Sequence, residues 1–168
     1  MVKNSAGLLL YRKILADYEV LLVHPGGPFW AKKDLGAWSI PKGELDLRED
    51  LETAAKREFE EEIGSPAPGG ECWSLGESKQ ASGKLVHAFA LEADFNLERF
   101  NSNMFEMEWP PKSGQKQEFP ENDKAAWIPL AAARQKLVKG QVCFIDRLAE
   151  HLGVNLSNND PAEQVTLF

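Results

Sequence analysis

The sequence predicts a protein of the α/β class, and two observations lead to this prediction. Short apolar runs bounded by turn-forming residues occur near the start and in the middle of the chain, as is typical of β-strands. Between them, apolar residues recur at helical spacing, namely Leu51, Ala54, Ala55, Phe59 and Ile63. The 168 residues, 43% of them hydrophobic, suffice for one domain with a substantial core.

The first half of the chain predicts two strands and a helix. Residues 5–12 and 19–24 form apolar runs separated by a turn at residues 16–18, which indicates a hairpin. The helix is expected to begin after Asp50, a residue that caps helix N-termini, and to end at Gly64, which suits the left-handed conformation that stops helices.

The second half predicts a second pair of strands and two closing helices. Residues 71–80 and 84–94 form the strands, and the latter is apolar on both faces, so we expect it to be central in a sheet. Residues 95–123 have no regular period, and a loop of that length usually has a function. Helices are expected at residues 129–138 and 141–152.

Composition limits the classes of function. The net charge of −7 argues against a nucleic-acid-binding surface, which needs clustered basic residues. No apolar run is long enough to span a membrane, and the short patch before Arg12 lacks a cleavage site, so we expect no signal peptide. Cys72 and Cys143 have no CxxC partner. We expect two free thiols in a reducing cytoplasm, with a disulfide between them as the alternative.

Three glutamates of the predicted helix point to a metal site. Glu58, Glu61 and Glu62 are spaced i, i+3 and i+4, so their side chains converge on one patch, with Glu58 and Glu62 within the apolar face and Glu61 at its edge. Unpaired carboxylates on a half-buried face typically cost several kcal/mol each, and a divalent cation such as Mg²⁺ would neutralise them. The alternative is a solvated acidic face.

The residues around this patch resemble a known motif. Gly43, Glu49 and the run REFEEEIG at residues 57–64 have the spacing of the Nudix box, except that Ser65 replaces the usual aliphatic residue. The resemblance implies a Nudix hydrolase with an α/β/α sandwich around a mixed β-sheet. It also implies cleavage of a nucleoside diphosphate linked to another group, with Mg²⁺ or Mn²⁺ as the cofactor.

The resemblance also implies roles for individual residues. The metal ligands would be the carbonyl of Gly43 and the carboxylates of Glu58, Glu61 and Glu62. Arg57 would hold the catalytic glutamate in place, and Lys42 would meet a substrate phosphate. A further metal-binding and catalytic glutamate is expected about six residues before Trp127, which is Glu121, with Glu118 in reserve. Either Glu58 or Glu121 would act as the general base.

Two loops are candidates for substrate recognition. In the loop after residue 24, Trp30 could stack on a base and Lys32 or Lys33 could meet phosphates, or the tryptophan could simply cover the core. The segment 95–123 is expected to fold over the metal site, with Trp109 or Phe105 against the nucleoside. The alternative for this segment is a strand-containing insert.

The predicted substrate is a dinucleoside polyphosphate or a nucleoside triphosphate, and the alternative function is a non-catalytic Nudix-fold module that senses a nucleotide. The domain is expected to span residues 1–152, in a monomer or homodimer, followed by a disordered tail at residues 153–168. The final residues, QVTLF, resemble a short bacterial motif that docks on the replication sliding clamp, and a plain tail is the alternative.

Overall fold

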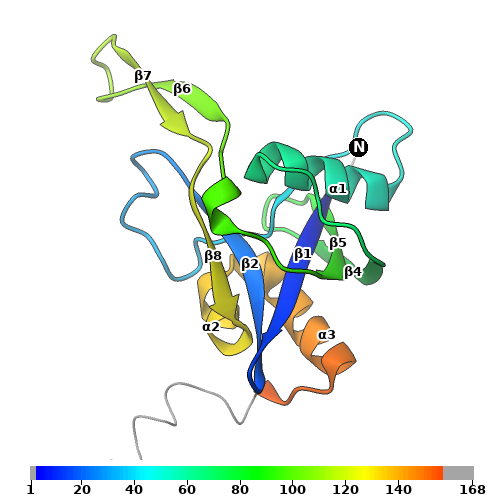
Figure 1. Ribbon diagram of the computed structural model, residues 1–168. Helices are drawn as coiled ribbons and strands as arrows, with labels where there is room; N and C mark the ends of the chain where they lie inside the picture. The colour runs from blue at the N-terminus through cyan, green and yellow to red at the C-terminus, as the bar shows by residue number, and fades with distance from the viewer. Residues whose placement is uncertain (1–2, 157–168) are drawn as a thin grey trace, which may run out of the picture.

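A mixed β-sheet with helices on both faces forms the architecture of the chain (Figure 1). The computed structural model describes residues 3–156. The strands are β1 (Asn4–Ile14), β2 (Asp17–Pro25), β3 (Lys42–Glu44), β4 (Trp73–Lys79), β5 (Leu85–Glu92), β6 (Met104–Glu108), β7 (Lys116–Pro120) and β8 (Asn122–Pro129). The helices are α1 (Leu51–Ile63), α2 (Leu130–Lys136) and α3 (Val142–Leu152), with short 3₁₀ turns at Leu97–Arg99 and Lys139–Gln141.

The main sheet has six strands in the order β4-β5-β1-β2-β8, with β3 added to β1. β1 and β5 run parallel and the other pairs are antiparallel, as expected for a mixed sheet. β1 pairs with β2 only near its end, so the segment before β3 fits between the two strands. There the amide of Leu8 donates to the carbonyl of Pro41 at 3.1 Å, and Ser39 bridges to Val23. This insertion delivers Lys42 and Gly43 to the sheet edge beside α1.

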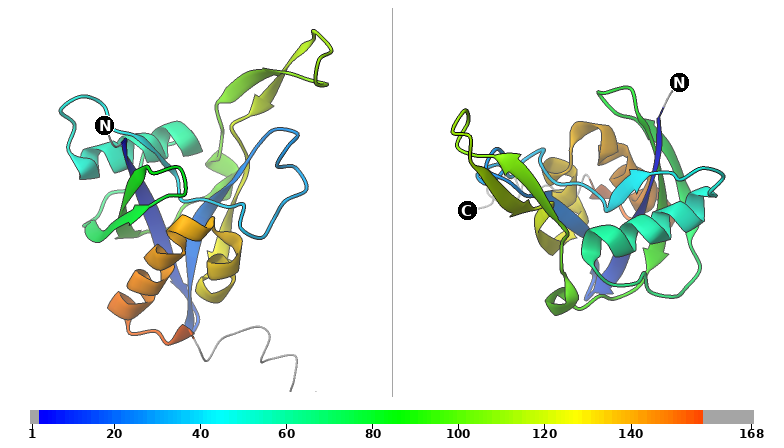
Figure 2. Two further views of the ribbon diagram at one scale, coloured as in Figure 1. Left: turned by 180° about the vertical axis from the view of Figure 1, so that it is seen from behind. Right: turned by 90° about the horizontal axis from the view of Figure 1, so that it is seen from above.

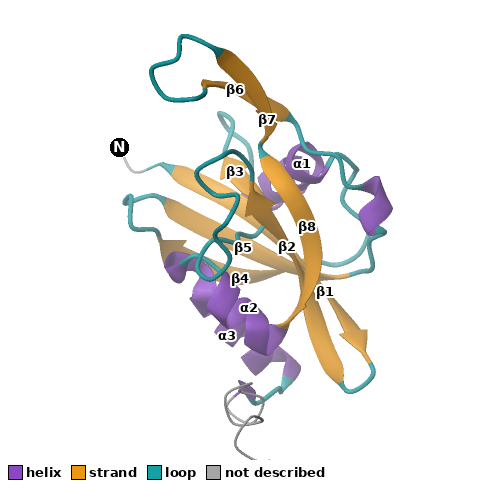
Figure 3. Ribbon diagram, turned by 90° about the vertical axis from the view of Figure 1, so that its left-hand side faces the viewer, coloured by secondary structure: helices purple, strands orange, loops and turns teal. Residues whose placement is uncertain are grey.

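The sheet separates two apolar clusters, one under each helical layer. Views from above and from the side show α1 on one face and α2 and α3 on the other (Figures 2 and 3). Under α1, the buried residues include Leu8, Leu10, Leu21, Ala55, Phe59 and Ile63. Under α2 and α3, they include Leu9, Leu22, Trp38, Phe144, Ile145 and Leu148. Alternate residues of β1 therefore point to opposite clusters, which is the two-residue period of a strand, and the expected sandwich is confirmed.

Helix α1 has the predicted ends. The side chain of Asp50 accepts a hydrogen bond from the amide of Thr53, and Gly64 follows the helix with φ of 84°. Such a cap satisfies one of the free amides of the first turn, and a left-handed residue is inexpensive only for glycine. These two residues fix where the helix begins and where it ends.

Two expectations from sequence need correction. The first hairpin turns at Leu15 and Ala16, because Asp17 and Tyr18 already pair with β1. The C-terminal tail does not begin at Gly153, because Val154 and Leu156 pack against the cluster under α3. The part of the predicted tail after residue 156 lies outside the described residues.

The segment expected to be a long loop contains a second, two-stranded sheet. β6 and β7 form an antiparallel hairpin that extends away from the main sheet (Figure 1). The strand-containing alternative was therefore correct, although β6 pairs with β7 and not with the main sheet. Alternate residues Phe105, Met107 and Trp109 are half-buried, and Trp109 packs edge-on against Phe29 with ring centroids 5.4 Å apart. This contact joins the hairpin to the loop after β2.

Candidate functional site

The candidate site lies where β3 meets α1. The carboxylate of Glu58 lies so close to Gly43 that a Cβ at this position would overlap it. Only a glycine therefore permits this approach. Glu58 is 8% exposed although it is charged. β3 and the helix thus bring the backbone of one residue against the buried carboxylate of another, fifteen positions later in sequence.

Arg57 orders the carboxylates around it. Its Nη1 donates to Glu58 at 2.9 Å and to Glu61 at 3.1 Å, while Nε and Nη2 both bind Glu49 at 2.8 Å. Nη2 also donates to the carbonyl of Glu44 at 3.1 Å. The guanidinium group presents its donors in a rigid fork, so one side chain can fix several oxygens at once. The expectation that Arg57 holds a glutamate in place has a direct geometric basis here.

Electrostatics distinguish the carboxylates of the site. Burial raises the pKa of Glu58 and of Glu62, and neighbouring carboxylates raise both further. By contrast, hydrogen bonds from Arg57 lower the pKa of Glu49 to about 2. Burial also lowers the pKa of the Lys42 ammonium group, and the nearby Lys84 adds to this effect. The negative charges of Glu58 and Glu62 are therefore only partly offset by neighbouring donors and cations. The positive charge of Lys42 is likewise only partly offset by neighbouring carboxylates.

These features fit a divalent cation with oxygen ligands. Within residues 3–156, no three acidic, histidine or cysteine side chains already converge as a preformed metal cluster. Glu58 and Glu62 are nevertheless disfavoured as anions, and the close approach of Gly43 leaves its backbone next to Glu58. Mg²⁺ binds through a few carboxylates and keeps several waters, so a complete protein cage is not required. Gly43, Glu58, Glu61 and Glu62 are the residues that could hold it.

A cavity of about 600 Å³ opens next to Lys42 of β3. Of the residues predicted to bind substrate, Trp30 and Lys42 line it. The other lining residues that are described are Pro25, Ala37, Ser39, Gln80, Ala81, Ser82, Asn122, Val138, Lys139, Gly140 and Gln141. The charged members of this set are two lysines, and the rest are neutral. Such a lining suits a ligand with an anionic group and a flat, uncharged part.

The other predicted residues lie outside this lining. Lys32 is exposed, and Trp109 packs against Phe29 of the neighbouring loop. Glu121 is exposed just before β8, where its charge contributes to the raised pKa of Glu62. Glu121 is therefore near the carboxylates of α1, whereas Lys32 and Trp109 are not brought into the cavity.

Sequence reasoning missed Asn122, which joins the two parts of the site. This buried residue donates a hydrogen bond from its side-chain amide to Glu62 and also lines the cavity. It also missed Gln141, which is fully buried and accepts a hydrogen bond from the amide of Ile40 at 2.9 Å. A polar residue at the start of a strand, as Asn122 is, or just before a helix, as Gln141 is, gives no sign of what it will face, so no signal in the sequence would have found either residue.

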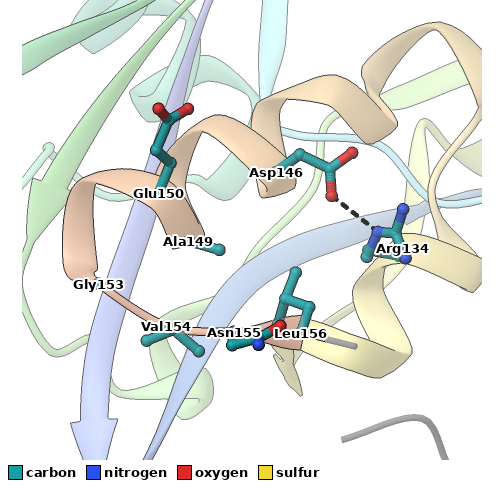
Figure 4. Close-up of a pocket in the computed structure, with 8 residues that line it drawn as sticks. All are labelled: Arg134, Asp146, Ala149, Glu150, Gly153, Val154, Asn155 and Leu156. Atoms are coloured by element: carbon teal, nitrogen blue, oxygen red, sulfur yellow. Dashed lines mark ion pairs between the residues drawn. The ribbon is translucent and has the colours of Figure 1, made fainter. Parts of the chain in front are cut away.

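A second cavity, of about 500 Å³, lies at the end of α3 (Figure 4). Arg134 donates to Asp146 at 2.8 Å across it, so its two central charges already compensate each other. None of the predicted site residues lines this cavity. The larger cavity, which contains Trp30 and Lys42, is therefore the better candidate for substrate.

The sequence of residues 3–148 matches the profile of the NUDIX domain, which is most of the chain. The chain belongs to the NUDIX domain family. Its helix α1 carries the glutamates of the Nudix box. The expected family and fold are both confirmed.

Several known proteins resemble this Nudix domain, and their names mention different substrates or ligands. An RNA pyrophosphohydrolase of Rhodospirillum rubrum is 41% identical over 64 residues, which span 36% of this chain and 37% of that relative. Two solved structures cover 90% of the chain. The NUDIX domain of Shewanella oneidensis NrtR, complexed with ADP ribose, has a TM-score of 0.61 at 18% identity over 89% of its own length. The C. elegans Ap4A hydrolase has a TM-score of 0.56 at 22% identity over 99% of its length.

Proposed function

We propose that this Nudix domain is a pyrophosphohydrolase that cleaves a nucleoside diphosphate linked to another group with Mg²⁺ or Mn²⁺. One observation carries the proposal. The cavity lined by Trp30 and Lys42 shares Asn122 with the carboxylate patch of α1. A nucleotide in this cavity would place its base near the tryptophan and its phosphates near Lys42 and the glutamates.

The residues of the chain have distinct parts in this reaction. Bound between Glu58, Glu61, Glu62 and the Gly43 carbonyl, the cation would neutralise phosphate oxygens and lower the pKa of an attacking water. Lys42 binds a phosphate, and this contact favours the charged form that burial disfavours. Glu121 is the candidate for a further ligand.

Arg57 keeps the oxygens of Glu58 and Glu61 in fixed positions, which lowers the cost of organising the site during the reaction. Of the two candidates for the general base, Glu58 is favoured over Glu121, because Glu58 is buried against Gly43 and held by Arg57, whereas Glu121 is exposed.

The favoured substrates are a dinucleoside polyphosphate and a nucleoside triphosphate. The names of the C. elegans and Rhodospirillum rubrum proteins support phosphoanhydride substrates that carry a nucleoside. The net charge of −7 favours a small nucleotide over an extended RNA.

The test is product release from a panel of compounds with Mg²⁺. The panel contains dinucleoside polyphosphates, nucleoside triphosphates, ADP-ribose, a diphosphoinositol and a 5′-triphosphorylated RNA. We expect rapid turnover of a dinucleoside polyphosphate or a triphosphate. Nucleotide binding without turnover of any member would instead support the alternative, a nucleotide-sensing module. Retention of Glu58, Glu61, Glu62 and Arg57 favours the enzyme, because a sensor has no need of a charged catalytic patch.

Replacing Trp30 with alanine tests the placement of the base. We expect KM to rise about tenfold with kcat changed by less than about threefold, because stacking of an aromatic side chain on a base contributes ~1–3 kcal/mol. Steady-state kinetics with the best substrate would measure KM and kcat separately. Leu35→Ala is the matched control, since Leu35 is exposed in the same loop but does not line the cavity. Equal changes in KM for both variants would contradict stacking on Trp30.

We also propose a cytoplasmic location and a contact of the last five residues with a replication sliding clamp. Residues 164–168 lie outside the described part of the chain, and support comes from their resemblance to the docking motif. Removing these residues is expected to abolish binding to an immobilised clamp and to leave turnover unchanged. Absence of binding by the intact chain would contradict this proposal.

None of the helices within residues 3–156 combines the length and the apolar character that a membrane-spanning helix needs.

A further inference from the structure

Three asparagines hold the C-terminal end of α1. The backbone amide of Asn101 donates to the carbonyl of Ile63 at 2.8 Å, and the side-chain amide of Asn103 donates to the carbonyl of Glu61 at 3.3 Å. Both contacts satisfy carbonyls that have no partner within the helix. The third residue, Asn122, is different because its amide donates to a side chain, the carboxylate of Glu62.

Asn122 is held in place independently of the glutamate. It is 7% exposed, and its backbone amide donates to Ser102 Oγ at 2.9 Å. The preceding residue, Glu121, donates its amide to the carbonyl of Asn103 at 2.7 Å and accepts from the amide of Gly26 at 2.8 Å. The backbone around Asn122 is thus fixed by the loop after β2 and by the strand that leads into β6. A side chain on such a fixed backbone can orient its partner.

The chemistry of the amide suits a carboxylate that must stay available. An asparagine amide donates a hydrogen bond without adding a positive charge, so it orients Glu62 while leaving its negative charge for a cation. Arg57 acts differently on Glu58 and Glu61, because its charge partly cancels theirs. The donor from Asn122 reaches one carboxylate oxygen of Glu62, Oε2. The second oxygen is the one that can face the cation.

We propose that Asn122 is a positioning residue that orients the Glu62 carboxylate for divalent-cation binding from its place in the wall of the substrate cavity. This inference rests on the proposed cation-dependent function. Hydrogen-bonding partners that orient metal ligands typically contribute about 10–100-fold to metal affinity or activity. The same side chain belongs to the cavity that also contains Lys42. A ligand in this cavity therefore contacts the residue that sets the direction of Glu62.

The test measures Mn²⁺ binding directly, by the electron paramagnetic resonance signal of free Mn²⁺ titrated with purified protein, without substrate. Asn122→Ala is expected to weaken Mn²⁺ binding about tenfold, the lower end of the effect of such partners. Asn103→Ala is the matched control, because it removes an amide contact to the same helix end but leaves every carboxylate contact intact. We expect Asn103→Ala to bind Mn²⁺ within about twofold of the natural chain, since its contact ends on a backbone carbonyl.

A second variant keeps the test decisive if Asn122→Ala does not fold. Asn122→Leu has nearly the same shape and fills the buried space but has no donor, so it should weaken Mn²⁺ binding to a similar extent. Unchanged Mn²⁺ binding in whichever of these variants folds would overturn the inference and leave Asn122 as a packing residue. Tighter Mn²⁺ binding would also overturn it, because the amide would then be competing with the cation for Glu62.

The same titration separates failure of this inference from failure of the proposed function. If the natural chain binds Mn²⁺ and Glu62→Gln weakens that binding, the cation site stands and only the role of Asn122 is in question. If the natural chain and Glu62→Gln bind Mn²⁺ equally poorly, the cation-dependent function itself is wrong. Thermal unfolding of each metal-free variant supplies a stability measurement, against which the loss of Mn²⁺ binding can be compared.

Discussion

Replacing Glu58 with glutamine is expected to lower kcat about a thousandfold, equivalent to ~4 kcal/mol of transition-state stabilisation. The change removes the buried charge that lies against Gly43 but keeps the shape of the side chain. Steady-state turnover of the best substrate at saturating Mg²⁺ is the measurement. Glu60→Gln, on the exposed side of the same helix, is the matched control and should retain full activity.

The same variant should be more stable than the natural chain when no metal is present. Because the pKa of Glu58 is raised by burial, its charged form destabilises the folded state, increasingly so as the pH rises above the ordinary value of 4.5. Glutamine has no charge to bury. We therefore expect a higher Tm at neutral pH for Glu58→Gln in the presence of a chelator. A lower Tm together with lost activity would indicate disruption of the fold and would contradict a specific catalytic role.

Replacing Gly43 with alanine is expected to lower kcat about a hundredfold and to destabilise the fold by ~1–3 kcal/mol. The new Cβ would overlap the carboxylate of Glu58, so either the carboxylate or β3 must move. Both movements change how the backbone of Gly43 lies against Glu58, and these residues are two of the proposed metal ligands. Turnover and chemical denaturation measure the two effects.

Gly69→Ala is the control for this substitution. A Cβ at Gly69 would meet no atom within 4 Å, and this glycine is not in the left-handed region. We expect activity and stability to remain close to those of the natural chain. If Gly43→Ala behaved like Gly69→Ala, the close approach of β3 to α1 would have no part in catalysis.

The elements that the sequence predicted well are those whose signals are local. Asp50 and Gly64 define α1 through contacts within a few residues of each helix end, and the apolar spacing between them defines its buried face. The glutamate spacing placed Glu58 and Glu62 on the buried side of the helix, with Glu61 more exposed. A helix converts such spacing directly into geometry, so this part of the site follows from the chain itself.

The rest of the site depends on contacts between segments that are distant in sequence. Asn122 and Glu62 are 60 residues apart and meet only because β8 follows the hairpin along the end of α1. The cavity walls come from loops near Trp30, Gln80 and Lys139, which no periodic pattern relates. The hairpin was predicted only as the alternative to a loop, because Glu106 and Glu118 lie opposite each other in an alternation that is only weakly apolar. A short strand with charged outer residues resembles a loop when its partner is unknown.

The hairpin β6–β7 has a consequence for how this domain can change over time. Because it pairs only with itself and stands clear of the main sheet, its tip between Glu108 and Lys116 can gain or lose residues without altering the register of any other strand. Its base is attached through Ser102 to Asn122, and Trp109 in its tip packs against Phe29 of the loop that carries Trp30. Inherited changes in the length of this arm are therefore expected to leave the main sheet and α1 as they are, and to be felt first by the loop after β2.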